Sequence, residues 1–118
     1  MDKNSFQMRA LNLLLQIRNG RVTTYQELAH AMGTRAYRAV GSAMAKNQFL
    51  GKYPCYKVVK SNSEVGQYAG ETWKKIDLLR EEGINIREGK VVDFEKVLFR
   101  SDEFKVWLSL QTQIPESI

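Results

Sequence analysis

Residues 24–46 read TYQELAHAMGTRAYRAVGSAMAK, a stretch that predicts two short helices joined by a glycine turn. Thr24 can cap the first helix, over residues 25–32, and Glu27 is placed to complete a capping box. Gly33 ends that helix, and the second helix is predicted over residues 37–46. The inner stripe expected for the second helix consists of Ala39, Val40, Ala43 and Met44. This arrangement is typical of a helix-turn-helix.

Before these helices, residues 5–18 carry apolar side chains at helical spacing, so a preceding helix capped by Ser5 or Asn4 is expected. After them, residues 56–60 predict a short strand, and residues 61–70 predict a turn followed by a returning segment. The strand and the returning segment together resemble the wing of a winged helix.

The C-terminal half predicts further helices and one hairpin. A fourth helix is expected over residues 71–82. Its expected inward-facing residues are Trp73, Ile76 and Leu79. Residues 84–92 predict a small hairpin, and residues 93–118 predict an extra helical segment. The predicted fold class is therefore mainly α, a winged helix-turn-helix with short β-hairpin and wing elements.

The length and composition fit one globular domain, residues 1–118, with 43% apolar residues. No stretch approaches the run of about 18 apolar residues that spans a bilayer, and the N-terminus lacks the apolar core of a signal peptide. We expect an intracellular protein, cytoplasmic and nucleoid-associated or nuclear, with no membrane partner. One cysteine and one histidine make no zinc cluster, so neither a metal nor a cofactor is expected.

The net charge of +5 is unevenly distributed. Residues 1–60 hold 10 Lys and Arg against 2 Asp and Glu, whereas residues 61–118 hold 8 against 11. A basic half fits a phosphate-backbone partner, because each neutralised phosphate releases counterions. The same charge is compatible with a solvated surface that aids solubility.

Gly41 lies inside the second predicted helix, where a glycine costs on the order of 1 kcal/mol relative to alanine. We therefore expect something to approach this helix closely. The neighbouring helix and a nucleic-acid backbone both fit, and the sequence leaves the two open.

Cys55 is the only cysteine, and it lies in residues 53–59, YPCYKVV. A nucleophilic thiolate needs partial exposure and nearby positive charge, and Lys52, Lys57 and Lys60 flank this position. A free cysteine is also often a small buried hydrophobe. The residues around Cys55 leave both interpretations open.

Several motifs together resemble the C-terminal, DNA-binding domain of the O6-alkylguanine-DNA alkyltransferases and the alkyltransferase-like proteins, over residues 6–86. In chain order they are GRVTTYQELA (20–29), RAVGSAM (38–44), KN (46–47), PC (54–55), VV (58–59), GQYAG (66–70) and LLREEG (78–83). Each motif is common by chance, and their shared order makes the resemblance specific.

The resemblance implies that Cys55 accepts the alkyl group of O6-alkylguanine and is not regenerated. The chain would then be a methylated-DNA–protein-cysteine S-methyltransferase that acts once per molecule. Its implied partner is double-stranded DNA carrying O6-alkylguanine, bound through the minor groove, with the damaged nucleotide flipped into a pocket.

The resemblance also assigns roles to individual residues. Arg38 enters the base stack and fills the vacated space, Tyr25 presses on the phosphate beside the flipped nucleotide, and small residues permit close approach. The implied DNA-binding residues are Tyr25, Arg38, Ala39, Gly41, Ser42 and Lys46. The implied substrate pocket comprises Met44, Pro54, Tyr68 and Ala69. The implied catalytic residues are Cys55, Tyr56, Glu82 and Asn47, of which Asn47 ties the turn after the second helix to the segment of Cys55.

One departure from the family pattern touches the mechanism. The usual Pro-Cys-His-Arg is here Pro-Cys-Tyr-Lys, so Tyr56 replaces a histidine that draws the thiol proton away while held by a glutamate, matched by Glu82. A phenol with an ordinary pKa of about 10 is a poor base near neutrality. We expect Tyr56 to donate a hydrogen bond to Glu82. We expect the thiolate to be stabilised by Lys57 or by the start of a helix. Alkyl transfer should then be slower than in proteins with the histidine.

Two other functions stay open. One is a non-catalytic, alkyltransferase-like protein that binds lesions and recruits other repair factors; such proteins typically lack the acceptor cysteine that this chain keeps. The other is a winged-helix DNA regulator, which reads bases in the major groove and needs no flipping apparatus. The helical tail is expected either to cover the core or to dock a protein partner.

Overall fold

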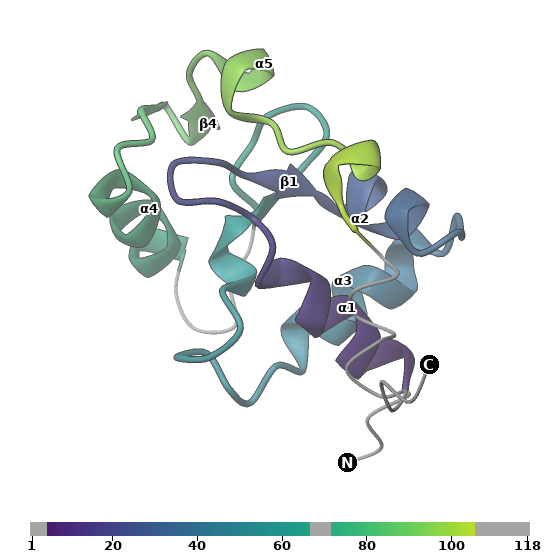
Figure 1. The fold of residues 1–118 in the computed structure, drawn as a ribbon. Helices are drawn as coiled ribbons and strands as arrows, with labels where there is room; N and C mark the ends of the chain where they lie inside the picture. The colour runs from purple at the N-terminus through teal and green to yellow at the C-terminus, as the bar shows by residue number, and fades with distance from the viewer. Residues whose placement is uncertain (1–4, 67–71, 106–118) are drawn as a thin grey trace.

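A computed structural model describes residues 5–66 and 72–105 of the chain (Figure 1). Its helices are α1 (Phe6–Leu14), α2 (Tyr25–Ala31), α3 (Tyr37–Ala45), α4 (Thr72–Glu81) and α5 (Phe94–Val97), with 3-10 turns η1 (Cys55–Lys57) and η2 (Ser101–Glu103). Its strands are β1 (Thr23–Thr24), β2 (Val58–Val59), β3 (Ile86–Arg87) and β4 (Lys90–Val91). None of the helices in the described ranges is long and apolar enough to cross a membrane.

Helix α1 begins as predicted and ends about one turn early. Ser5 Oγ accepts a hydrogen bond from the backbone N–H of Met8 at 3.1 Å, which is the expected N-cap. The helix ends at Leu14, because the chain then tightens into turns that leave Leu15 exposed and return Ile17 to the core. The predicted end at residue 18 is therefore wrong.

The helix-turn-helix is formed by α2 and α3. Thr24 Oγ1 accepts from the backbone N–H of Glu27 at 2.9 Å, and Gly33 makes the turn with a φ of +75°, which L side chains rarely adopt. The carboxylate of Glu27 accepts from the backbone N–H of Ser101 at 2.6 Å, so it holds the C-terminal segment and the predicted reciprocal capping bond is not seen. On α3 the predicted inner stripe is wrong at Ala39, which is exposed, and correct at Val40, Ala43 and Met44.

The strand predicted over residues 56–60 is shorter and begins later. Lys57 N–H donates to the carbonyl of Pro54 at 3.1 Å, which closes the η1 turn and leaves only Val58–Val59 extended. These two residues pair in parallel with β1, with Thr23 opposite Val58. The first part of the predicted wing packs on the β3–β4 hairpin through Val65 N–H to Gly89 O and Val91 N–H to Ser63 O, each 2.9 Å. Residues 67–70 lie outside the described ranges.

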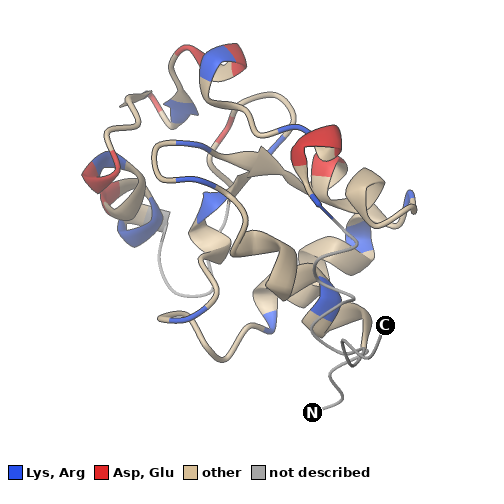
Figure 2. Cartoon of the chain, in the orientation of Figure 1, with Lys and Arg blue, Asp and Glu red and all other residues tan. Residues whose placement is uncertain are grey.

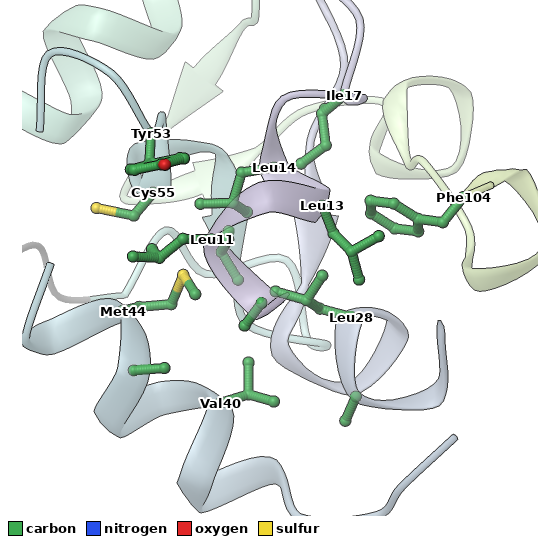
Figure 3. Packing of buried hydrophobic residues seen from close by; sticks show 14 of the residues in the cluster. Leu11, Leu13, Leu14, Ile17, Leu28, Val40, Met44, Tyr53, Cys55 and Phe104 are labelled. Carbon is green, nitrogen blue, oxygen red and sulfur yellow. The ribbon is translucent and has the colours of Figure 1, made fainter. Parts of the chain in front are cut away.

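Two clusters of buried apolar side chains form the core. The first lies between α1, α2 and α3 and includes Cys55, Phe99 and Phe104 (Figure 3). The second packs Leu79 of α4 against the β3–β4 hairpin and Val59. The predicted hairpin is confirmed, since β3 and β4 pair antiparallel.

The predicted inner face of α4 needs a correction. Leu79 is buried and Ile76 half-buried, but Trp73 is 58% exposed, with Lys74 Nζ 5.6 Å from its ring centre. The fully buried residue one turn before Leu79 is Lys75. Trp73 lies in the first turn of the helix, beyond the edge of the second cluster.

Residues 94–104 cover the core, the first of the two roles expected for the tail. Val22 N–H donates to Val97 O at 2.9 Å, and Thr23 Oγ1 donates to Phe99 O at 2.8 Å. Phe99 and Phe104 pack edge to face, with ring centres 4.8 Å apart, in the first cluster. Only α5 and η2 are helical here, and residues 106–118 lie outside the described ranges.

Candidate active site and nucleic-acid interface

Cys55 begins η1 at the edge of the first core cluster. The residue is 5% exposed, and in Figure 3 its sulfur points away from the labelled leucines. Burial raises the pKa of the Cys55 thiol, whereas a hydrogen bond with the Asn47 side chain and the positive charge of Lys75 act in the opposite direction. The thiol is therefore shielded from water beside groups that favour its ionised form.

Asn47 makes the connection predicted for it. Its Nδ2 donates to the carbonyl of Tyr53 at 3.0 Å, and its Oδ1 accepts from the backbone N–H of Phe49 at 2.8 Å. The carbonyl of Tyr53 also accepts from the backbone N–H of Cys55 at 2.8 Å. Asn47 thus connects the end of α3 to the loop that contains Cys55.

Glu82 lies at the centre of a second polar group. The hydroxyl of Tyr56 donates to Glu82 Oε2, as the sequence predicts. Glu82 Oε1 accepts from the backbone N–H of Gly20 at 3.0 Å and lies 3.1 Å from Lys57 Nζ. Lys57 Nζ also donates to the carbonyls of Ile17 and Arg18 at 3.1 and 3.2 Å. The expectation that Lys57 stabilises the thiolate is wrong, because its ammonium is bound to Glu82 and to these carbonyls.

Lys75 is the site residue that the sequence analysis missed. Its side chain is fully buried, and its Nζ donates to the carbonyl of Val58 at 2.6 Å. Burial lowers its pKa from 10.5 to about 8; Cys55 acts against this shift, and the positive charge of Lys60 acts with it. Helix periodicity could have revealed it, because Leu79 is predicted to face inward and Lys75, four residues earlier, lies on the same helix face.

Tyr25 lies half-buried against the first core cluster at the start of α2. Burial raises the pKa of its phenol, and the charge of Cys55 adds to this effect. A pocket of about 310 Å³ opens beside it. That pocket is lined by Tyr25, Gln26, Tyr37, Lys60, Ser61 and Asn62. The pocket offers hydroxyl, amide and ammonium donors, which suit a phosphate.

The outer face of α3 carries the remaining predicted DNA contacts. The exposed residues on it include Arg38, Ala39, Ser42 and Lys46. A Cβ built at Gly41 meets no atom within 4 Å, so the packing of the described residues does not require glycine there. This favours the second alternative left open by the sequence, an external partner. Figure 2 shows no acidic residue on α3, whereas α4, α5 and η2 carry several.

The predicted substrate pocket is placed only in part. Met44 is buried in the first cluster, near Cys55 in Figure 3, and Pro54 is half-buried directly before the thiol. Tyr68 and Ala69 lie outside the described ranges. The structure therefore brings Asn47, Tyr25 and Lys75 to Cys55 and groups Tyr56 with Glu82.

The fold and the site define a helix-turn-helix protein with a single shielded thiol at the edge of its core and exposed basic residues on the outer face of α3. Residues 5–84 match the family model described as 6-O-methylguanine DNA methyltransferase, DNA binding domain. The chain belongs to this family, and the resemblance and the fold class predicted from the sequence are confirmed.

Three similar proteins illustrate the match. A bifunctional methyltransferase/endonuclease of Thermoplasma volcanium is 44% identical over 98 residues, which cover 80% of this chain and 30% of that protein. A methylated-DNA–protein-cysteine methyltransferase of Metallosphaera sedula is 39% identical over 87 residues, 74% of this chain and 54% of that protein. The crystal structure of S. pombe Atl1 in complex with damaged DNA containing O6-carboxymethylguanine aligns with a TM-score of 0.73 at 25% identity, over 85% of this chain and 99% of that one.

The curated relatives are longer than the region they share with this chain. The match covers 30% of the Thermoplasma protein and 54% of the Metallosphaera protein. What those proteins do as a whole is therefore carried to this chain only as a proposal.

Proposed function

We propose that this chain repairs O6-alkylguanine in double-stranded DNA by flipping the damaged nucleotide and transferring its alkyl group to Cys55. The acceptor is not regenerated, so each molecule acts once, as a methylated-DNA–protein-cysteine S-methyltransferase. The observation that carries this proposal is the position of the thiol at the edge of the first core cluster, where its sulfur points away from the labelled leucines (Figure 3) and Asn47 and the charge of Lys75 favour its ionised form.

The transfer is a single displacement at carbon. The thiolate of Cys55 attacks the alkyl carbon, and an S–C bond forms as the bond from that carbon to guanine O6 breaks. The electron pair of the broken bond stays on guanine, which takes up one proton from solvent. The proton released by the thiol balances it, so the products are S-alkylcysteine and guanine.

DNA binding is assigned to the helix-turn-helix. The small exposed residues of α3, Ala39 and Ser42, allow its face to lie close to a minor groove, and Gly41 leaves space there. Flipping a nucleotide costs a few kcal/mol, and the planar guanidinium of Arg38 can fill the vacated place in the stack. The pocket beside Tyr25 then receives a phosphate next to the flipped nucleotide.

Tyr56 makes the transfer slower than in proteins with the family's histidine. The hydroxyl of Tyr56 donates to Glu82, and a phenol with an ordinary pKa of about 10 is a weak base at neutral pH. The thiol keeps some thiolate without a base, so transfer is slowed and not abolished.

A second candidate is a lesion-binding protein that does not transfer the alkyl group. The burial of Cys55, which raises the pKa of its thiol, favours this candidate. The likeness to the S. pombe protein in complex with damaged DNA also supports it.

One experiment separates these candidates. The protein is incubated with a duplex containing O6-methylguanine, and the tryptic peptide that carries Cys55 is weighed. We expect a mass increase of one methylene unit, absent from Cys55→Ser and from incubation with unmodified duplex. An unchanged peptide after long incubation rejects transfer; lesion-selective binding in a gel shift then supports the second candidate, and equal affinity with strong sequence preference supports a regulator.

A further inference from the structure

We propose that Tyr37 is a further DNA-binding residue: its hydroxyl donates a hydrogen bond to a phosphate next to the flipped nucleotide, and His30 holds that hydroxyl in place. The inference rests on the proposed function, because it concerns how the DNA is held while the nucleotide is flipped. It makes Tyr37 a binding residue and His30 a positioning residue, two roles that the sequence analysis assigns to neither.

Tyr37 lies where the two helices of the helix-turn-helix meet the pocket beside Tyr25. It is the first residue of α3 and directly precedes Arg38. Its side chain lines that pocket, so an aromatic residue from the start of each of the two helices contributes to the lining. Tyr37 is 38% exposed, and burial in the core therefore does not account for a tyrosine at this position.

The pocket suits an anion. The turn after β2 contributes residues 60–62 to its lining, including the positive charge of Lys60, and none of the lining residues is acidic. The side-chain amide of Asn62 is already engaged, because its Nδ2 donates to Glu64 Oε1 at 2.5 Å. A phosphate in the pocket would therefore depend on Lys60 for charge and on hydroxyl groups such as that of Tyr37 for hydrogen bonds.

The hydroxyl of Tyr37 is held by the preceding helix. It forms a hydrogen bond with His30 Nε2 at 3.0 Å, and the two rings pack edge to face with their centres 5.8 Å apart. Within residues 5–66 and 72–105 this is the only hydrogen bond of that hydroxyl. A phenol has one donor proton and two acceptor lone pairs, so the hydroxyl can bind a second partner.

The chemistry of a phosphate fixes the direction of both hydrogen bonds. A phosphodiester oxygen only accepts, so Tyr37 must donate its single proton to the phosphate, and His30 must then donate from Nε2 to the tyrosine oxygen. DNA binding therefore selects the ring form that carries a proton on Nε2 over the form in which Nε2 accepts from the hydroxyl. Hydrogen bonds to charged groups stabilise more than those between neutral groups, so this arrangement favours the complex.

The first test measures binding to a duplex that contains O6-methylguanine. Every protein carries Cys55→Ser, so that the lesion is not consumed. Tyr37→Phe removes the hydroxyl and keeps the ring, and we expect it to bind about tenfold more weakly than its parent. Unchanged binding by Tyr37→Phe overturns the inference.

Two substitutions of His30 form a matched pair, because leucine and glutamine are both good helix formers. His30→Leu removes the donor, and we expect binding to weaken about threefold. His30→Gln offers another side-chain N–H donor and should bind like its parent. Adding His30→Leu to Tyr37→Phe should cause no further loss, because the histidine acts through the tyrosine. A full additional loss in the double variant contradicts the positioning role.

A chemical change in the DNA separates a phosphate contact from an effect on the fold. The two phosphates that flank the modified guanine are replaced, one at a time, by a neutral methylphosphonate. On one of the two duplexes Tyr37→Phe should lose little further affinity, because the charged acceptor is already gone. An equal loss on both modified duplexes and on the ordinary duplex would mean that the hydroxyl acts through the fold, and the inference would be wrong.

A last measurement needs no substitution of either residue. His30 is the only histidine of the chain, so nitrogen NMR of the imidazole reports on it alone when no histidines are added. In the complex with the lesion duplex Nε2 should carry a proton, and an unprotonated Nε2 overturns the inference. Binding and transfer are measured separately. Weaker binding of Tyr37→Phe with no alkylation of native Cys55 rejects the proposed transfer alone, whereas normal alkylation with unchanged binding of Tyr37→Phe rejects this inference alone.

Discussion

Lys57 and Lys75 are both buried, yet their ammonium groups meet different surroundings. Lys57 Nζ lies 3.1 Å from a carboxylate oxygen of Glu82 and also donates to two backbone carbonyls. Lys75 Nζ donates to the carbonyl of Val58, and its charge acts on the thiol of Cys55. The first lysine therefore forms a buried ion pair, whereas burial lowers the pKa of the second.

Lys57→Met gives the largest expected effect. The variant leaves the carboxylate of Glu82, whose side chain is 11% exposed, without its cation. We expect the free energy of unfolding to fall by about 3–5 kcal/mol, as when one partner of a buried pair is removed. Urea denaturation followed by circular dichroism measures it. Adding Glu82→Gln should recover part of the loss, because no buried carboxylate charge remains. A loss below about 1 kcal/mol, the range of surface changes, contradicts the structural role.

Lys75 should instead make the stability depend on pH. The folded protein releases the proton of Lys75 near pH 8 and the unfolded chain near 10.5, so the unfolded chain binds more protons between these values. The free energy of unfolding should therefore rise by about 3 kcal/mol as the pH increases from 8 to 10.5.

This rise is isolated by comparing Lys75→Met with its parent. Both proteins carry Cys55→Ser, because the raised pKa of the thiol contributes a slope of the opposite sign. The parent should show the rise, beginning at a lower pH because Cys55 no longer raises the pKa of Lys75, and Lys75→Met should not show it. Parallel curves for the two proteins would show that burial does not penalise the charged lysine.

The two lysines also illustrate which features could be predicted from the sequence and which could not. The helix-turn-helix follows from local signals, namely the Thr24 cap, the Gly33 turn and the apolar spacing, and these hold in the structure. The contact of Tyr56 with Glu82 follows from motif order, which carries information about positions far apart in the chain. Lysines 57 and 75 look alike in the sequence, because their roles depend on tertiary packing.

Two features lay beyond local patterns for physical reasons. The β1–β2 pairing joins two-residue strands from distant parts of the chain, which are too short to show an alternation. The sequence predicts that Trp73 lies on the inner face of α4, because apolar residues are expected inside. Packing instead buries Lys75 on that face and leaves Trp73 exposed.

Tyr56→His tests whether a histidine held by Glu82 can act as a general base for the Cys55 thiol. The change places a base with a pKa near neutrality beside Glu82 and next to Cys55. General bases contribute about 10²–10⁴-fold, so we expect a gain of about a hundredfold in the single-turnover transfer rate at neutral pH.

Tyr56→Phe is the control, because it removes the hydrogen bond to Glu82 without adding a base, and it should react no faster than the native protein. If Tyr56→His and the native protein react equally fast, Glu82 serves only the fold.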